Sequence, residues 1–248
     1  MNEAAGAGPW LAGGLALALA AVHLFAGRLR FLSVTPRSVW LSMSGGASVA
    51  YVFVHLLPEL AAAQESLERS DLAFLGPSAE IYLVALAGLA IFYGLERAAE
   101  TSRRERRDQG EEDAASPGVF WLHTVSFALY NLLIGYLLLH REDPGLRSLL
   151  LFALAMGLHF LVNDYGLRHH HRRLYDRVGR WVLAVAVLLG WAVGLRLEIR
   201  ELHVALLFAF LAGGVVLNVL KEELPAERES RFWAFAVGAG GYAVLLLI

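Results

Sequence analysis

The chain has no cysteine among its 248 residues and few charged side chains. Without cysteine there can be no disulfide, no thiolate metal site and no Fe–S cluster. Charged residues make up 18% of the chain, less than the roughly one quarter found in soluble domains, and 57% are hydrophobic. This composition predicts a polytopic membrane protein.

The first nine residues also lack lysine and arginine, and carry Glu3 instead. A secretory signal peptide has a basic n-region, so we expect the first apolar segment, 10–26, to be kept as a membrane span. The chain shows no zincin motif, no Cys–His pair and no paired carboxylates of the kind that hydrolases use. We therefore predict that the protein is not an enzyme, and we expect no nucleic-acid partner.

Apolar runs separated by charged or turn-rich segments predict an all-α polytopic membrane protein with eight transmembrane helices. Their ranges are 10–26, 39–60, 81–95, 119–139, 148–164, 181–195, 203–220 and 232–248. We expect Pro58 to break the second helix near its end. The strongly charged segment 96–117 is expected to be a cytoplasmic loop with little order. Residues 1–248 then form a single membrane domain.

The distribution of basic residues predicts the orientation of these helices. Of the 21 Lys and Arg residues, 16 lie in the connectors after the first, third, fifth and seventh helices, and 5 lie in the alternate connectors. Because cytoplasmic loops carry the excess of Lys and Arg, the odd connectors are predicted to be cytoplasmic and both termini to lie outside. The alternation also favours an even number of spans.

A weak internal repeat relates the second and seventh helices. Gly46 precedes Pro58 by 12 residues, and Gly213 precedes Pro225 by the same 12. The charge distribution predicts that these two helices run in opposite directions. Inverted repeats with a substrate site between them are typical of transporters.

Polar residues in the fifth predicted helix are the first candidates for a functional site. His159 and Asn163 are four residues apart, so they share one helical face. An imidazole and a carboxamide at hydrocarbon depth are costly unless they face a partner or a cavity. Two interpretations stay open here: a hydrogen bond between helices, or part of a polar gully that binds a solute.

The fourth predicted helix offers further polar side chains and contains no Lys or Arg. They are His123, Ser126, Tyr130 and Asn131. A divalent cation that crosses a membrane needs such ligands on facing helices. A carboxylate is missing from this gully, because Asp164 is predicted to point away from the face of His159. The alternative is that Ser126, Tyr130 and Asn131 only satisfy backbone or neighbouring helix groups.

Two more groups lie near the helix ends. His55 and Glu59 are four residues apart and form either an entry site or a solvated interfacial pair. His169, His170 and His171 lie among arginines at the predicted cytoplasmic face. This tract is either a metal exit site or a basic segment that meets anionic lipid.

The sequence resembles the ZIP family of divalent metal transporters over most of its length. The eight spans, the charged segment between the third and fourth helices, and His55-Leu-Leu-Pro58-Glu59 at the end of the second helix carry this resemblance. So does the interval from Gly46 to Pro58. The resemblance implies a ZIP-like bundle of 3+2+3 helices with an inverted repeat.

The resemblance extends to the helices that hold the metal in that family. Aligned on Gly135, the fourth helix places Ser126, Phe127, Tyr130 and Asn131 at the family's motif positions. In the fifth helix, His159 matches the first family ligand, Asn163 the second and Asp164 the last motif position. Phe127 and Phe160 occupy positions of second-metal ligands, so the implied metal site is degenerate.

By this resemblance the protein is a ZIP-like transporter that moves a divalent metal, zinc or a similar ion, into the cytoplasm. The metal is then a substrate, and no tightly bound cofactor is expected. The alternatives are a non-transporting ZIP-fold sensor or scaffold, or a carrier of a neutral or protonatable solute with His159 as a switch. We expect the protein in a bacterial inner membrane; a homodimer stays open.

Overall fold

The computed structural model describes residues 8–27, 39–68, 80–110, 116–141, 145–223 and 231–247. Within these ranges the chain is helical and contains no strand. The helices are α1 (Pro9–Ala26), α2 (Val39–Tyr51), α3 (Leu57–Glu68), α4 (Glu80–Asp108), α5 (Pro117–Leu137), α6 (Leu146–Leu174), α7 (Arg180–Gly194), α8 (Glu201–Glu223) and α9 (Phe232–Leu247). Two π-helical turns, η2 (Val52–Leu56) and η3 (Tyr175–Gly179), connect α2 to α3 and α6 to α7.

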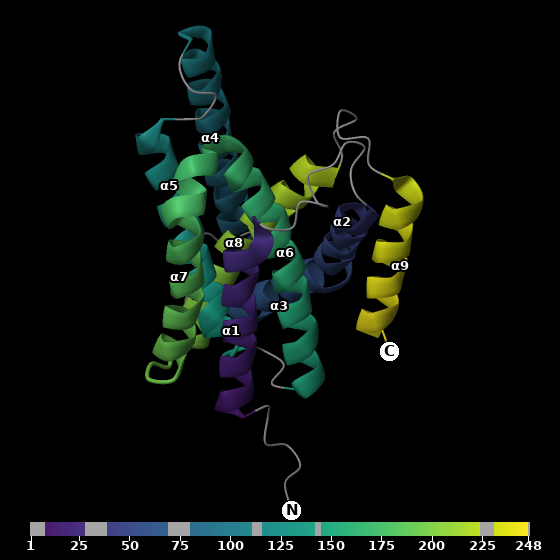
Figure 1. The fold of residues 1–248 in the computed structure, drawn as a ribbon. Helices are drawn as coiled ribbons and strands as arrows, with labels where there is room; N and C mark the ends of the chain where they lie inside the picture. Colours follow the sequence, from purple (N-terminus) through teal and green to yellow (C-terminus); the bar gives the residue numbers. More distant parts are fainter. Residues whose placement is uncertain are drawn as a thin grey trace, which may run out of the picture. The chain divides into compact units, whose positions relative to one another are not determined.

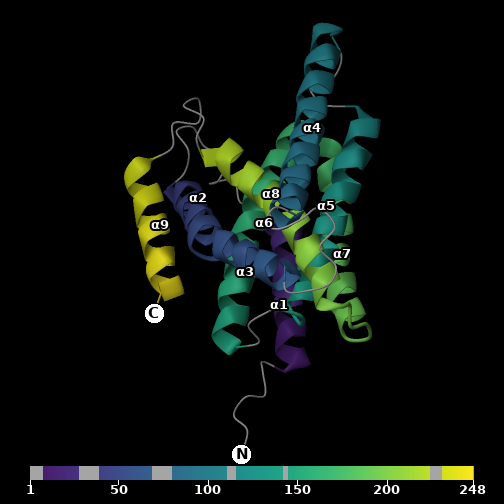
Figure 2. The same ribbon diagram turned by 180° about the vertical axis from the view of Figure 1, so that it is seen from behind.

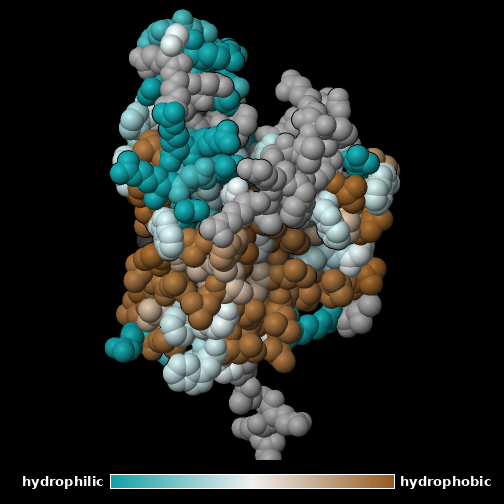
Figure 3. Space-filling model, in the orientation of Figure 1, coloured by the Kyte–Doolittle hydropathy of each residue, from teal (hydrophilic) through white to brown (hydrophobic). Residues whose placement is uncertain are grey.

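The all-α class is confirmed for the described residues. Seven helical segments are long and apolar enough to cross a membrane, and α9 is a shorter apolar helix of 16 residues. Large apolar side chains such as Leu17, Leu129 and Leu189 are exposed along these helices. Figure 3 shows hydrophobic residues over α1 and α7 and hydrophilic ones at the far end of α4. Exposed apolar side chains along apolar helices suggest a multi-pass membrane protein.

The helices fall into two compact units, and the single membrane domain 1–248 stays a prediction. Unit 1 contains residues Met1–Arg30 and Leu95–Glu198, and unit 2 contains Phe31–Gly94 and Ile199–Ile248. Unit 1 therefore holds α1, the end of α4, α5, α6 and α7. Unit 2 holds α2, α3, the first part of α4, α8 and α9. Each unit combines segments from both halves of the sequence.

In unit 1, α7 packs against both α1 and α5, and α6 packs against the same two helices. Figure 1 shows α1 between α6 and α7. The indole of Trp191 covers Gly13, and its Nε1 atom donates a hydrogen bond to the carbonyl of Pro9 at 3.3 Å. The start of α1 is thereby fixed to the end of α7.

In unit 2, α2 packs along α9, and both α2 and α3 contact α8. The α2–α9 pair is visible in Figure 2. The backbone N–H of Ile81 donates to Oε1 of Gln64 at 2.9 Å, which connects the start of α4 to α3. The N–H of Arg231 donates to Oγ of Ser42 at 3.2 Å, which connects the residue before α9 to α2.

Three helix pairs cross at glycines in the same register. The pairs are Gly46 with Gly238 (α2–α9), Gly213 with Gly88 (α8–α4) and Gly135 with Gly190 (α5–α7). In every pair, a methyl group added to either glycine would clash with the backbone carbonyl oxygen three residues before the other. Glycine is therefore required at these six positions for the helices to approach so closely.

The second predicted helix does not end at Pro58. Helical structure continues from Val39 to Glu68 through the π-turn η2, which lies directly before this proline. In the π-turn, the N–H of Leu57 donates to the carbonyl of Val52. The wider turn leaves room for the pyrrolidine ring, so the helix bends without breaking. Glu59 therefore lies within a helix, near the start of α3.

Two helices are longer than predicted. The α4 helix continues to Asp108, so residues 96–108 of the predicted loop are helical, while 111–115 lie outside the described residues. Glu, Arg and Ala are strong helix formers, and Arg97 pairs with Glu100 at 2.7 Å. The α6 helix continues past Asp164 to Leu174 because its buried face continues with Leu167 and His171.

We expect the substitution Gly238→Ala to lower the free energy of unfolding by about 1–3 kcal/mol, because the added methyl group forces α9 away from α2. Gly240→Ala in the same helix is the matched control, since no atom lies within 4 Å of its added methyl group. Thermal unfolding in detergent measures both variants. Equal midpoints for the two would contradict the close crossing.

Candidate functional site

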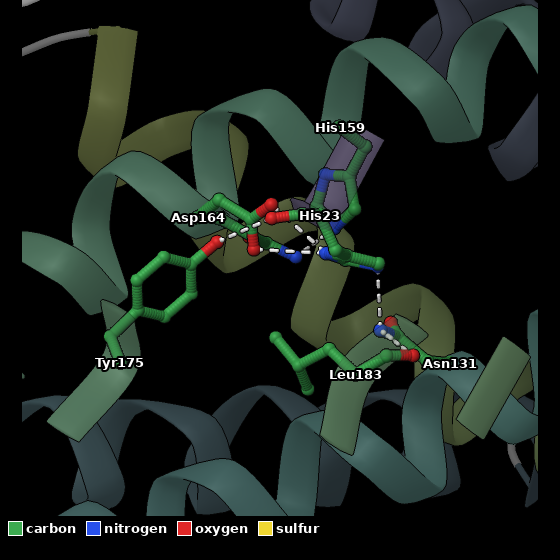
Figure 4. Close-up of polar contacts among 7 residues, drawn as sticks. His23, Asn131, His159, Asp164, Tyr175 and Leu183 are labelled. Carbon is green, nitrogen blue, oxygen red and sulfur yellow. Dashed lines mark hydrogen bonds and ion pairs between the residues drawn. The ribbon is translucent and has the colours of Figure 1, made fainter. Parts of the chain in front are cut away.

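The most deeply buried ionisable pair in the described residues joins α1 to α6 within unit 1. The Nδ1 atom of His23 lies 3.0 and 2.9 Å from the two carboxylate oxygens of Asp164. Each side chain is only 1% exposed. Figure 4 shows the imidazole facing the carboxylate. A buried ion of this kind costs several kcal/mol unless it is paired and hydrogen-bonded, so its partners must be identified.

Asn131 of α5 contacts the other side of the imidazole. Its Nδ2 atom donates to Nε2 of His23 at 2.8 Å and to the carbonyl oxygen of Leu183 in α7 at 3.4 Å. Because the amide nitrogen donates, Nε2 of His23 accepts, and Nδ1 carries the proton that is donated to Asp164. In this arrangement His23 is neutral, and an ionised Asp164 leaves one negative charge in the site.

Aromatic residues enclose the pair. The ring of Phe160 lies 4.3 Å from the His23 ring, centroid to centroid, and Phe160 is fully buried. Tyr175, in η3, is also fully buried, and its hydroxyl donates to the backbone carbonyl of His23 at 3.3 Å. Figure 4 shows this hydroxyl turned toward the side of the site that holds Asp164. The enclosure lowers the local dielectric and strengthens every charge interaction within it.

The helical repeat explains why these residues meet. Along α6, the residues Phe160, Asp164 and Leu167 follow one another at intervals of three or four and are all buried. They form one stripe that faces the interior of unit 1. Asp164 therefore lies on the buried face of α6, opposite the last turn of α1.

A second polar group lies beside the pair. The Nδ2 atom of Asn163 donates to Nε2 of His159 at 2.9 Å, and the ring of Tyr130 lies 5.5 Å from the His159 ring. His159 and Tyr130 are buried. The predicted neighbours on the fourth and fifth helices thus do come together. His159 and Asn163, however, bond to each other within α6, and Asn131 bonds to His23 in α1.

Ser126 does not join this cluster. Its hydroxyl donates to the backbone carbonyl of Leu122 in the preceding helical turn at 2.9 Å. The satisfied-backbone interpretation therefore applies to Ser126. Asn131 also reaches a backbone group, the carbonyl of Leu183, in addition to His23.

The predicted entry group belongs to unit 2, and the predicted exit group follows Asp164 along α6 in unit 1. His55 and Glu59 form a pair in unit 2, with Nε2 and Oε2 3.4 Å apart and exposed fractions of 38% and 19%. The side chains of His169 and His170 lie outside the described residues. His171 is buried, with Nε2 3.4 Å from Nδ1 of His123, which is also buried.

The principal additions to the predicted site are one carboxylate, that of Asp164, and one imidazole, that of His23. Asp164 does not bond to His159 but joins the buried network through His23, a partner that was not predicted. His23 is the only ionisable residue in the first predicted span, and this isolation was the available signal. Its partner is 141 positions away, so no local pattern identifies it.

The chemistry of the network suits a cation or a proton. Imidazole nitrogen, carboxylate oxygen and carboxamide oxygen are ligands that divalent metals accept. Among the described residues, no group of three or more His, Cys, Asp or Glu side chains is arranged to hold a metal ion. The site therefore offers at most His23 and Asp164 as strong ligands, with Asn131 as a neutral one.

Comparisons with known proteins add no family assignment. No family model matches the chain, and no curated protein matches it.

We expect His23→Leu to destabilise the fold by about 3–5 kcal/mol, because it leaves the Asp164 carboxylate buried without its partner. Asp164→Leu should cost less, since a neutral His23 keeps its bond to Asn131. The double variant His23→Leu/Asp164→Leu should recover most of the loss. Unfolding in detergent measures the cycle, and equal losses in both single variants would refute the charge assignment.

Proposed function

We propose that the protein is a ZIP-like membrane carrier that moves a divalent metal ion, zinc or a similar cation, into the cytoplasm. The observation that carries the proposal is the buried carboxylate of Asp164 on α6, paired with His23 of α1. Ionisable residues within membrane spans are rare and mark ion pathways or proton relays. We assign the cation site to His23, Asn131 and Asp164, with His159 and Asn163 beside it.

Electrostatics favours a cation at this position. A dication that leaves water loses a large hydration free energy, and neutral ligands alone do not compensate for it. The carboxylate of Asp164 supplies the negative charge, because His23 in its assigned tautomer is neutral. The neutral imidazole has its lone pair on Nε2, which can bind a metal ion in place of the hydrogen bond from Asn131.

The glycine crossings support the proposed 3+2+3 arrangement with eight spans, in which α9 is the eighth. The repeat equates Gly46 in α2 with Gly213 in α8. Gly46 faces Gly238 of α9, and Gly213 faces Gly88 of α4, in the same register. If α2 is exchanged with α8 and α9 with α4, the α2–α9 contact thus becomes the α8–α4 contact. Pairwise exchange of this kind is what an internal repeat in a transporter requires.

The remaining features fit this transporter in an inner membrane with both termini outside. The solvated pair His55–Glu59 is proposed as the entry group. Its i, i+4 spacing in a helix keeps an imidazole and a carboxylate on one side. The histidine tract 169–171 is proposed as the cytoplasmic exit group, since it lies among the arginines that orient the chain.

A second candidate function is a non-transporting relative that senses a ligand or binds a partner. The observation that favours it is that the ring nitrogens in the network are already hydrogen-bonded within the chain. Nδ1 and Nε2 of His23 both have partners within the chain, and Asn163 occupies Nε2 of His159. A proton-linked carrier of a neutral solute would share this closed resting state. Transport measurements separate these functions.

Zn²⁺ uptake into proteoliposomes, in competition with Mn²⁺, Fe²⁺ and Co²⁺, tests the proposal. We expect saturable uptake by the wild type and background uptake by Asp164→Asn, which keeps the shape of the side chain and removes its charge. His159→Ala should also lose uptake. Ser126→Ala is the matched control and should retain it, because the Ser126 hydroxyl donates to the carbonyl of Leu122 in its own helix.

Uptake by Asp164→Asn at the wild-type rate would refute the assigned site. No uptake above empty liposomes by folded wild-type protein would refute metal transport and favour the sensor or scaffold.

A further inference from the structure

A pair of buried imidazoles lies in unit 1 apart from the His23–Asp164 network. His123 comes from α5 and His171 from α6, and they are 3% and 2% exposed. Nδ1 of His123 and Nε2 of His171 lie 3.4 Å apart, and the two rings stand at 87° to each other. Two nitrogen atoms from separate helices therefore converge on one point in the interior.

The separation of these nitrogens matches a shared metal ion. At 3.4 Å the two nitrogens can share a long hydrogen bond, and the same spacing fits two ligands of one ion. Two imidazole nitrogens at about 2.0–2.1 Å from a tetrahedral zinc ion are about 3.3–3.4 Å apart. The spacing of the two nitrogens is thus the one that a tetrahedral ion imposes.

The backbone contributes to this geometry. His171 lies inside α6 with φ −138° and ψ 37°, outside the helical region. An interruption of a helix at one residue changes the direction of that side chain and commonly marks a functional site. Without it, the side chain of His171 would follow the regular helical direction.

Aromatic rings pack against both imidazoles. The ring of Phe120, which is fully buried, lies 5.4 Å from the His171 ring, and Phe127 lies 5.8 Å from the His123 ring. Arg172 and Arg173 follow His171 in the chain and are exposed. His171 is therefore followed directly in the chain by arginines at the surface.

We infer that His123 and His171 form a second cation site, which binds a borderline transition-metal ion such as Zn²⁺ or Co²⁺ through two imidazole nitrogens. Two neutral imidazoles without a carboxylate favour such ions over Mg²⁺ and Ca²⁺, which prefer oxygen ligands. The inference rests on the proposed function for the identity of the cation, and it places a holding site before release at the arginine-rich end.

Equilibrium binding of Co²⁺ to the full-length protein in detergent tests the inference, with the visible absorption of bound Co²⁺ as the spectroscopic signal. We expect two bound ions per wild-type chain and one in His123→Gln, in His171→Gln and in Asp164→Asn. Removing a residue that hydrogen-bonds to a metal ligand lowers the metal affinity about 10- to 100-fold. Removing a ligand itself should therefore lower the affinity of this site by more than about 100-fold. Excess Zn²⁺ should displace both ions.

The variants separate the two proposals. If both histidine variants bind as many ions as the wild type and only Asp164→Asn loses one, the second site is refuted and the assigned transport site stands. If Asp164→Asn binds two ions and each histidine variant binds one, the second site stands and the assigned transport site is refuted. Each histidine variant alone is a sufficient test of the second site. Circular dichroism shows whether a variant is folded, and if one variant is misfolded the other still gives the answer.

Discussion

The organisation of unit 1 depends on keeping one carboxylate out of water. Asp164 is buried in an apolar helix, and its stability requires that His23 be held within 3.0 Å. That requirement extends outward, because His23 is in turn held by Asn131 and by the hydroxyl of Tyr175. One charge thus determines how α1, α5, α6 and η3 must be placed. A network of this kind is stabilising only if every member is satisfied.

Close helix contacts provide the rigidity that such a network needs. The crossing of α5 and α7 at Gly135 and Gly190 fixes the backbone that carries Asn131 and Leu183, which bond to each other. Backbone-to-backbone contact leaves little freedom for the two helices to slide, because no flexible side chain lies between them. The same kind of contact recurs twice in unit 2. Small residues therefore determine the positions of the polar ones.

Helical class and the starts of most helices could be predicted from the sequence, because apolar runs set both. Helix ends could not. Charged residues such as Arg97 and Glu100 suggested a loop, yet both favour helix, and Pro58 was accommodated by a π-turn. Of the site, His159 and Asn131 were found because a polar side chain in an apolar run stands out. The partner of Asp164 could not be predicted, because the buried face of α6 is defined by α1 and nothing local to α6 identifies that neighbour.

The π-turn η2 has a consequence for unit 2 as a whole. A π-turn adds a residue to a helix, and each residue of an α-helix rotates the chain by about 100°. The residues after η2 are therefore out of phase with those before it. Gly46 in α2 is turned toward α9, whereas Gln64 in α3 bonds to the start of α4. A single continuous helical segment can thus pack against two different neighbours. The change of phase turns its contact face without a loop or a second helix.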